Sequence, residues 1–373
     1  MCRELTRREL LRFSGLVAAT PLIIRYNRPV RAFAQVASRA VPINLELVTL
    51  TDSQAILTWF TGDPTTLDSY GRPAPIPADT VVQLGTHPAA LHTVVERDDQ
   101  TPYHYVELGG LEPGQTYFYL CLSNGRVATP TQVAATATST GQFTVPMPPP
   151  GKHLFTMAWA NDAHIGESTS GLAASSPVPG TPGGGFPPGF PVDPNNPYWQ
   201  VMALAAVAES RQRGAELLLV AGDLTSEAAP ADMARAKSYL DGFGAYRSDY
   251  FVVRGNHDRP HKGAAYDGCR PAAGSDARDC LLDTFFPDGR TFFSFDRAGV
   301  HFVGLDTNDV NGMGAITAEQ FDWLQADLTA HHGTPTFLFG HHPVSEESAA
   351  TALPPIVFTV NQQDAQRLEG IVA

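Results

Sequence analysis

The residues Gly255-Asn256-His257-Asp258 directly follow the apolar run Phe251-Val252-Val253-Arg254. The apolar run predicts a buried β-strand, so the polar residues lie where that strand ends. The Asn256 carbonyl is a neutral oxygen ligand for a hard or borderline metal ion, and His257 beside it can face a substrate. This combination after a strand predicts a metal-dependent site at the edge of a sheet.

Two earlier segments end in the same way. An apolar strand predicted at 154–160 leads to Asp162 and His164, whose spacing lets both side chains turn toward one metal ion. The buried strand predicted at 216–221 leads to Asp223, a carboxylate that can bridge two cations. Taken singly, the first pair could be a polar loop, and Asp223 could be the N-cap of the next helix.

The strand predicted at 336–340 ends in the run Gly340-His341-His342. His341 is the better ligand candidate because it lies nearest the strand, and we expect His342 to have a supporting or structural role. Each histidine alone could be a satisfied core residue. The four motifs together predict one dinuclear site, because sheets of this kind bind ligands at the carboxyl ends of their strands.

From residue 153 onward, predicted strands alternate with predicted helices, which indicates an α/β unit built from βαβ connections. Thr317 is predicted to N-cap one of the helices, with Gln320 completing a capping box. The remaining strands are expected at 250–254, 292–296 and 300–306, and the helices around 198–213 and 231–243, from 318 and from 362.

Residues 41–145 have short strand patterns separated by turn residues, which predicts an all-β domain. The run from Leu111 to Tyr117 reads Leu-x-Pro-Gly-x-x-Tyr and resembles the tyrosine corner of fibronectin type III-like sandwiches. Trp59 lies in an apolar strand and is expected in the core between the two sheets. A proline-rich linker at 146–152 then leads into the α/β unit.

Residues 153–373 resemble the calcineurin-like metallophosphoesterases in these four motifs. With the sandwich in front, the chain also resembles the purple acid phosphatase-like branch of that superfamily. The resemblance implies two sheets flanked by helices in an αββα sandwich. It implies that His257 is the general acid or transition-state stabiliser at the leaving group, and that Asp258 orients it.

The resemblance also implies the metal ligands. One ion would be held by Asp162, His164 and Asp223, and a second by Asp223, Asn256 and His341. The ions would be two divalent or trivalent metals such as Fe, Mn or Zn, and a metal-bound hydroxide would be the nucleophile. The implied activity is that of a phosphomonoesterase or phosphodiesterase, with a small-molecule phosphoester as substrate.

Two features depart from the family pattern. The family closes its site with a Gly-His-x-His run, whereas no histidine follows His342 in this sequence. We therefore expect a metallophosphoesterase domain that is incomplete at its C-terminus, with a degenerate relative as the alternative. Purple enzymes place a tyrosine three residues after the bridging aspartate, where this chain has Ser226, so we expect no iron–tyrosinate chromophore.

A second hypothesis is a catalytically inactive or fragmentary relative in which the sandwich serves as a binding or adhesion module. The presence of Asp162, His164, Asp223 and the later motif residues argues against it. The absent closing run argues for it.

The first 34 residues have the pattern of a twin-arginine export signal. Arg7 and Arg8 precede a short apolar run, and Ala32-Phe33-Ala34 offers a cleavage site. The run is too short and interrupted to form a stable membrane span. We expect the protein to be exported to the periplasm, cell surface or exterior; the alternative is the basic N-terminal helix of a cytoplasmic protein.

The chain of 373 residues has a formal net charge of −13 although its first 34 residues are basic. The acidic remainder lacks the broad basic face of a nucleic-acid-binding protein, so no nucleic acid partner is expected. The sequence does not indicate an oligomeric state.

Cys121 lies in an apolar strand pattern and is expected to be buried. Cys269 and Cys280 bracket a polar loop and either form a disulfide or remain two thiols. The segment 170–197 is rich in Pro, Gly and Ser and could be a substrate lid or a disordered insertion.

Overall fold

The computed structural model describes residues 39–67, 73–130, 140–167, 197–308, 314–345 and 359–373. The expected signal segment at 1–34 lies outside these residues, as does nearly all of the 170–197 segment. The chain divides into two compact units, one ending at Pro150 and the other beginning at Gly151.

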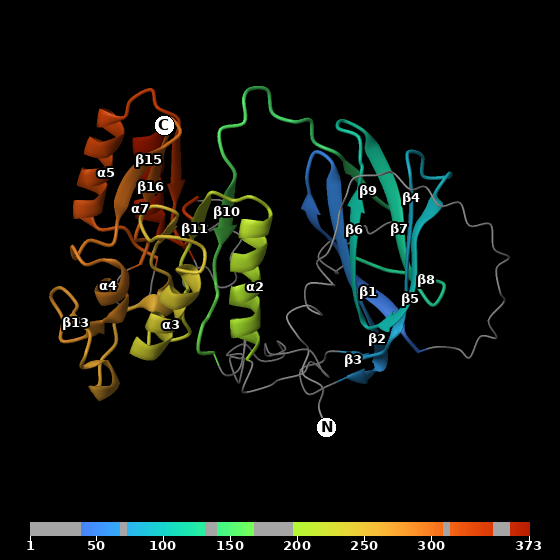
Figure 1. The fold of residues 1–373 in the computed structure, drawn as a ribbon, viewed down its shortest axis with the longest axis horizontal. Helices are drawn as coiled ribbons and strands as arrows, with labels where there is room; N and C mark the ends of the chain where they lie inside the picture. The colour runs from blue at the N-terminus through green and yellow to red at the C-terminus, as the bar shows by residue number, and fades with distance from the viewer. Residues whose placement is uncertain (1–38, 68–72, 131–139, 168–196, 309–313, 346–358) are drawn as a thin grey trace. The chain divides into compact units, whose positions relative to one another are not determined.

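The first unit is a β-sandwich of two antiparallel sheets (Figure 1). One sheet contains β1 (Val41–Leu50), β2 (Gln54–Leu67), β3 (Pro73–Pro75) and β6 (Tyr103–Gly109). The other contains β4 (Ala78–Gly85), β5 (His92–Thr101), β7 (Thr116–Ser123), β8 (Arg126–Val127) and β9 (Gly141–Thr144). The predicted all-β architecture is confirmed.

The core of the sandwich contains the residues that the sequence placed there. Trp59 is 3% exposed, and Cys121 is a fully buried free thiol. The Tyr117 hydroxyl accepts a hydrogen bond from the backbone N–H of Glu112 at 3.2 Å. This bond is the tyrosine corner that the Leu-x-Pro-Gly-x-x-Tyr run predicts, and it supports the fibronectin type III-like assignment.

His104 is a buried member of this core. Its ring stacks on Trp59 with a centroid separation of 4.6 Å, and its Nδ1 lies 2.8 Å from the Thr80 hydroxyl. Burial lowers the pKa of His104 to about 4. The histidine is therefore neutral at pH 7 and packs as a polar aromatic side chain.

The second unit begins with a parallel sheet in the order β10 (Met157–Ala160), β11 (Leu217–Val220) and β12 (Tyr250–Val252). The four residues of β11 are all buried, as expected for a parallel strand covered on both faces. One face of this sheet packs against α2 (Tyr198–Gln212) and α3 (Pro230–Leu240). Met233 and Ala236 of α3 are fully buried in this contact.

A second, mixed sheet contains β15 (Phe293–Arg297), β16 (Val300–Gly304) and β17 (Thr336–Phe339). Strand β16 pairs antiparallel with β15 and parallel with β17. The helices α5 (Ala318–Ala330) and α7 (Gln362–Val372) cover its outer face through Phe321, Leu324 and Leu368 (Figure 1).

Aromatic side chains join the two sheets face to face. Phe251 of β12 stacks on Phe295 of β15 with a centroid separation of 3.6 Å. Trp159 of β10 meets Phe337 and Phe339 of β17 edge-on at 5.8 and 5.9 Å. With helices on both outer faces, this arrangement confirms the predicted αββα sandwich.

The start of α5 differs from the prediction in one respect. The Thr317 hydroxyl accepts a hydrogen bond from the backbone N–H of Gln320, as an N-cap does. The Gln320 side chain does not complete a capping box. It is buried and pairs with the backbone of Asp306, accepting from the N–H and donating to the carbonyl, both at 2.8 Å. This pairing ties α5 to the segment after β16.

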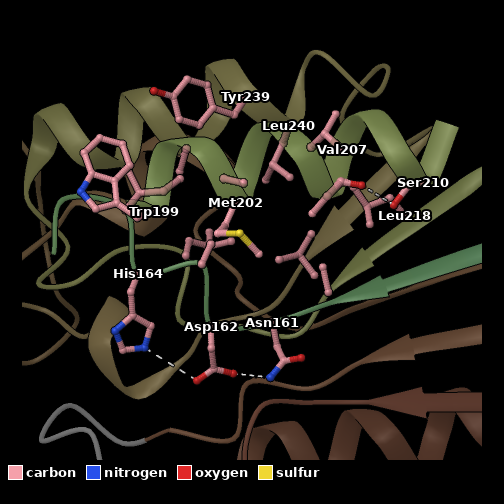
Figure 2. Close-up of a pocket in the computed structure, with 18 of the residues that line it drawn as sticks. Asn161, Asp162, His164, Trp199, Met202, Val207, Ser210, Leu218, Tyr239 and Leu240 are labelled. Carbon is pink, nitrogen blue, oxygen red and sulfur yellow. Dashed lines mark hydrogen bonds and ion pairs between the residues drawn. The ribbon is translucent and has the colours of Figure 1, made fainter. Parts of the chain in front are cut away.

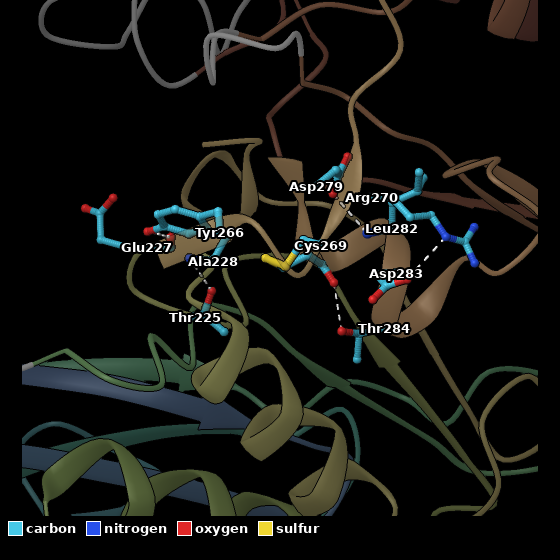
Figure 3. Close-up of a disulfide and its surroundings, with 11 residues drawn as sticks. Thr225, Glu227, Ala228, Tyr266, Cys269, Arg270, Asp279, Leu282, Asp283 and Thr284 are labelled. Carbon is cyan, nitrogen blue, oxygen red and sulfur yellow. Dashed lines mark hydrogen bonds and ion pairs between the residues drawn. A yellow bond between two sulfur atoms is a disulfide. The ribbon is translucent and has the colours of Figure 1, made fainter. Parts of the chain in front are cut away.

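Cys269 and Cys280 form a disulfide (Figure 3). It connects the short hairpin of β13 (Arg270–Pro271) and β14 (Arg278–Asp279) to the start of α4 (Cys280–Phe285). Asp279 caps α4 by accepting from the Leu282 N–H at 2.9 Å. The open question of the cysteine pairing is thus resolved in favour of the bond.

Within the described residues, no helix is both long and apolar enough to cross a membrane.

Candidate metal centre

Backbone hydrogen bonds bring the ends of β10 and β11 together. The N–H of Asp162 donates to the Gly222 carbonyl at 3.1 Å, and the N–H of His164 donates to the Asp223 carbonyl at 3.0 Å. The two predicted motifs therefore continue the parallel pairing of their strands into the loops. As a result, Asp162, His164 and Asp223 lie in one cluster.

Gly222 and Gly255 allow the loops after β11 and β12 to touch. A Cβ atom on Gly255 would lie 2.0 Å from the Asp223 nitrogen, and one on Gly222 would lie 2.6 Å from the Gly255 nitrogen. Only glycine fits at either position without moving the backbone. This close contact is the physical reason why glycine precedes both Asp223 and Asn256 in the sequence.

Three site residues have left-handed backbone conformations that side chains other than glycine rarely adopt. The φ angles are 56° for Asp162, 45° for His164 and 50° for Asp223. Such conformations are disfavoured and concentrate at functional sites, where the surrounding structure holds them in place. Here the strand-end hydrogen bonds supply that support.

Asp223 lies at the centre of the cluster and is 3% exposed. Its Oδ2 is 3.3 Å from His164 Nε2 and 3.5 Å from His341 Nε2. His164 Nε2 is also 3.7 Å from Asp162 Oδ1. One carboxylate thus faces ligand atoms from both predicted half-sites, which is the arrangement a bridging ligand needs.

His341 and Asn256 complete the second half of the cluster. The His341 Nδ1 lies 2.8 Å from the Ala221 carbonyl, which can only accept, so Nδ1 carries a hydrogen. In the neutral ring, Nε2 is then a lone-pair donor toward a metal, and it lies 2.9 Å from the Asn256 Oδ1. A cation bound between His341 Nε2, Asn256 Oδ1 and the Asp223 carboxylate would give each of these lone pairs a partner.

The electrostatics of the other half also favour a cation. Hydrogen bonds that His164 donates to the carboxylates of Asp162 and Asp223 raise the pKa of His164 to about 10. Two carboxylates therefore stabilise positive charge at this imidazole. The residues include carboxylate, imidazole and amide groups, which suit Zn, Mn or Fe ions. The donor set fits the two-metal centre that the sequence predicts.

His257 lies at the edge of the cluster, with its ring centroid 4.5 Å from that of His164. Its backbone N–H donates to Asp223 Oδ1 at 2.8 Å, and its Nδ1 donates to the Ser226 carbonyl at 2.6 Å. The carbonyl fixes the ring orientation and leaves Nε2 as the nitrogen that can exchange a proton with a substrate.

Asp258 does not orient the His257 ring as expected. Its carboxylate is completely buried and accepts hydrogen bonds from the backbone N–H groups of Leu224, Thr225 and Gly255 at 3.0 to 3.1 Å. The Thr225 hydroxyl adds a fourth at 3.0 Å. Burial, together with the charge of Asp223, raises the pKa of Asp258 to about 6. Asp258 holds the two loops together, and the Ser226 carbonyl orients His257.

Sequence reasoning also missed Glu167. Its Oε2 lies 3.6 Å from His164 Nδ1, on the side of the ring away from Asp223. The turn is closed by a hydrogen bond from the Glu167 N–H to the His164 carbonyl at 3.0 Å. The sequence does contain a hint of this contact, because an acidic residue stands three positions after His164. Carboxylates often pair with the ring nitrogen of a metal-binding histidine that faces away from the metal.

Two other groups of histidines are buried or partly buried in the second unit. His342 is buried, and its backbone N–H donates to the Thr307 hydroxyl at 3.0 Å, in line with the supporting role expected of it. His301 is buried between Asp296 and Asp327, each 2.7 Å from one ring nitrogen, and stacks on His331 at 3.6 Å. These contacts form a local cluster at the end of α5.

Residues 161–362 match the model of the calcineurin-like phosphoesterase family. The chain belongs to this family. The matched segment contains all of the cluster residues described above, and the predicted resemblance is confirmed.

Individual relatives are distant. A probable cyclic nucleotide phosphodiesterase from Synechococcus sp. is 25% identical over 164 residues, which cover 44% of this chain and 52% of that protein. A purple acid phosphatase from yellow lupin is 15% identical with a TM-score of 0.36, covering 88% of this chain and 56% of the other. PhoD is 14% identical with a TM-score of 0.32, covering 91% and 69%. The chain thus spans about half the length of the first two proteins.

Proposed function

We propose that this protein is an exported phosphoester hydrolase that uses two metal ions. The observation that carries the proposal is the position of Asp223, whose Oδ2 lies within 3.5 Å of imidazole nitrogens from both halves of the cluster. Family membership adds the reaction class, because the matching model describes phosphoesterases.

The proposed ligands are Asp162, His164 and Asp223 for one ion and Asp223, Asn256 and His341 for the other. When bound, such ions act as Lewis acids that neutralise charge on phosphoryl oxygens and activate water. The backbone holds these side chains in place before substrate arrives, because the ligand loops are joined by hydrogen bonds and by the contact between Gly222 and Gly255.

His257 is proposed as the group that delivers a proton to the leaving oxygen. Its Nδ1 is committed to the Ser226 carbonyl, so the proton would be held and released at Nε2. A positioned general acid of this kind contributes a rate factor of about 10²–10⁴.

The test is hydrolysis of p-nitrophenyl phosphate and bis-p-nitrophenyl phosphate by the full chain, with metal content measured on the same sample. We expect Asp223→Ala to abolish turnover and reduce bound metal. The matched control is Asp322→Ala, because that carboxylate is 78% exposed and pairs only with Arg367 among the described contacts. Metal-loaded protein that cleaves neither ester would contradict the proposal.

Export is a separate part of the proposal. It is supported by Arg7 and Arg8 ahead of an apolar run and by the Cys269–Cys280 disulfide, since disulfides persist mainly in oxidising compartments. Replacing both arginines with lysine in a reporter fusion of residues 1–38 should block export. The control exchanges Arg25 and Arg28 for lysine instead. Export that survives the first exchange would rule out the twin-arginine route.

A further inference from the structure

A cavity of about 480 Å³ opens beside Asp162 and His164. Figure 2 shows these two residues and Asn161 on one side of it, with side chains of α2 and α3 on the other. Its size is typical of sites that bind small organic molecules. The cavity lies next to only one half of the metal-ligand cluster, because Asn256 and His341 are not among its lining residues.

The wall away from the ligands is apolar. Helix α2 contributes Trp199, Met202 and Val207. The loop after β11 contributes Leu224, and α3 contributes Leu240. Both hydroxyl groups on this wall already donate within the protein. The Tyr239 hydroxyl donates to Gln200 Oε1 at 3.0 Å, and the Ser210 hydroxyl donates to the Ala206 carbonyl at 2.7 Å.

We propose that this cavity binds the apolar organic group of the substrate, so that the enzyme prefers phosphoesters of uncharged hydrophobic alcohols. The inference rests on the proposed phosphoesterase function, which would place the phosphoryl group at Asp162 and His164. A nucleoside fits poorly, because its base and sugar need several hydrogen-bond partners and this wall offers few. An aryl or alkyl group needs none and gains from burial.

The experiment measures binding of methyl-, butyl- and hexylphosphonate to the Mn²⁺-loaded full chain by calorimetry. Each methylene group that becomes buried should improve affinity by about fourfold. With part of the chain left in water, we expect hexylphosphonate to bind at least ~30-fold more tightly than methylphosphonate.

A cavity-filling variant locates the effect. Ala206 lines the cavity and Ala205 does not, although both are exposed on α2. Ala206→Phe should weaken hexylphosphonate binding at least ~10-fold, the loss of two or more buried methylenes, and leave methylphosphonate within twofold. Ala205→Phe should change neither affinity. If Ala206→Phe fails to fold, the chain-length series in the unchanged protein still decides the question.

The outcomes separate the two proposals. Equal affinity along the series, with methylphosphonate bound, would overturn the apolar cavity and leave the phosphoesterase function standing. Ala206→Phe weakening both phosphonates equally would also overturn it. If no phosphonate binds the metal-loaded chain, the phosphoryl site fails, and the role of the cavity fails with it.

Discussion

The guanidinium of Arg254 donates to the carboxylate of Asp279 at 2.6 Å, and Asp279 directly precedes the disulfide residue Cys280. The same guanidinium donates to Asp306 at 3.0 Å and to the Asp258 carbonyl at 2.9 Å. Arg254 is 5% exposed. One buried side chain therefore connects the loop that bears Asn256 and His257 to the disulfide hairpin and to the second sheet.

Removing this arginine should destabilise the protein strongly. Arg254→Met leaves the buried Asp279 and the partly buried Asp306 without their cation, a loss of about 3–5 kcal/mol. The measurement is the free energy of unfolding in urea. The control is Arg367→Met, whose surface pair with Asp322 should contribute less than about 1 kcal/mol. Similar effects of the two exchanges would refute the structural role of Arg254.

The disulfide should stabilise the protein by about 3 kcal/mol, because it closes a loop of 11 residues. Replacing Cys269 and Cys280 with alanine should lower the unfolding midpoint by that equivalent. Reductant should destabilise the unchanged protein and the Cys121→Ala variant, but it should not affect the double variant. If the double variant responds to reductant as strongly, another thiol is responsible.

Asp258 and His257 should respond differently to substitution. Asp258→Asn turns an amide N–H₂ toward backbone donors, so it should cost about 2 kcal/mol or more in stability and also lower activity. His257→Gln should lower the rate by about 10²–10⁴ with little change in the unfolding midpoint. Both properties are measured on each metal-loaded variant. An Asp258→Asn protein of normal stability would contradict the role of this carboxylate in holding the two loops together.

His104 should make the protein less stable in acid. Its pKa is lowered to about 4 in the fold, against about 6.5 in an unfolded chain. The unfolded state therefore binds more protons between these values, and stability falls as pH drops through this window. From pH 7 to 5 the loss is about 2 kcal/mol. The free energy of unfolding in urea should not show this acid loss in the His104→Gln variant. If the variant has the same pH dependence as the unchanged protein, His104 is not the source of the loss.

His301 should act in the opposite direction. Burial disfavours its charge, but hydrogen bonds to Asp327 and Asp296 outweigh burial and raise the pKa of His301. Its contribution to stability is complete below the unfolded pKa of about 6.5 and is lost as pH rises through the folded value. The other groups facing the ring are His331 and, through Asp327, Ser294. Asp327→Asn should remove most of this alkaline loss, and a loss of unchanged size would exclude His301 as its source.

Strands β11 and β12 were predictable because all of their residues are buried. The strand expected at 216–221 is observed at Leu217–Val220, and each ligand motif follows its strand as the pattern indicated. Such runs are continuously apolar, and the polar residues that end them stand out. This is why the candidate site could be assembled from sequence.

The errors arose where partners are backbone atoms or distant segments. Any residue offers a carbonyl, so nothing in the sequence marks Ser226 as the partner of His257. Gln320 fitted a local capping rule, but its side chain pairs with Asp306 from another element. The burial of His104, in contrast, follows from strand alternation. Its neighbours Tyr103 and Tyr105 are exposed, so His104 lies on the inward face of the strand.

The contact between Gly222 and Gly255 has a consequence for redesign of the site. It sets the distance between the loops of Asp223 and Asn256 at the level of the main chain. Residues that tolerate the main-chain conformation can then be exchanged at those positions while the glycine contact keeps the loops at this spacing. A library that varies the ligands but keeps both glycines should therefore yield folded proteins with changed metal preference, whereas one that varies the glycines should yield few.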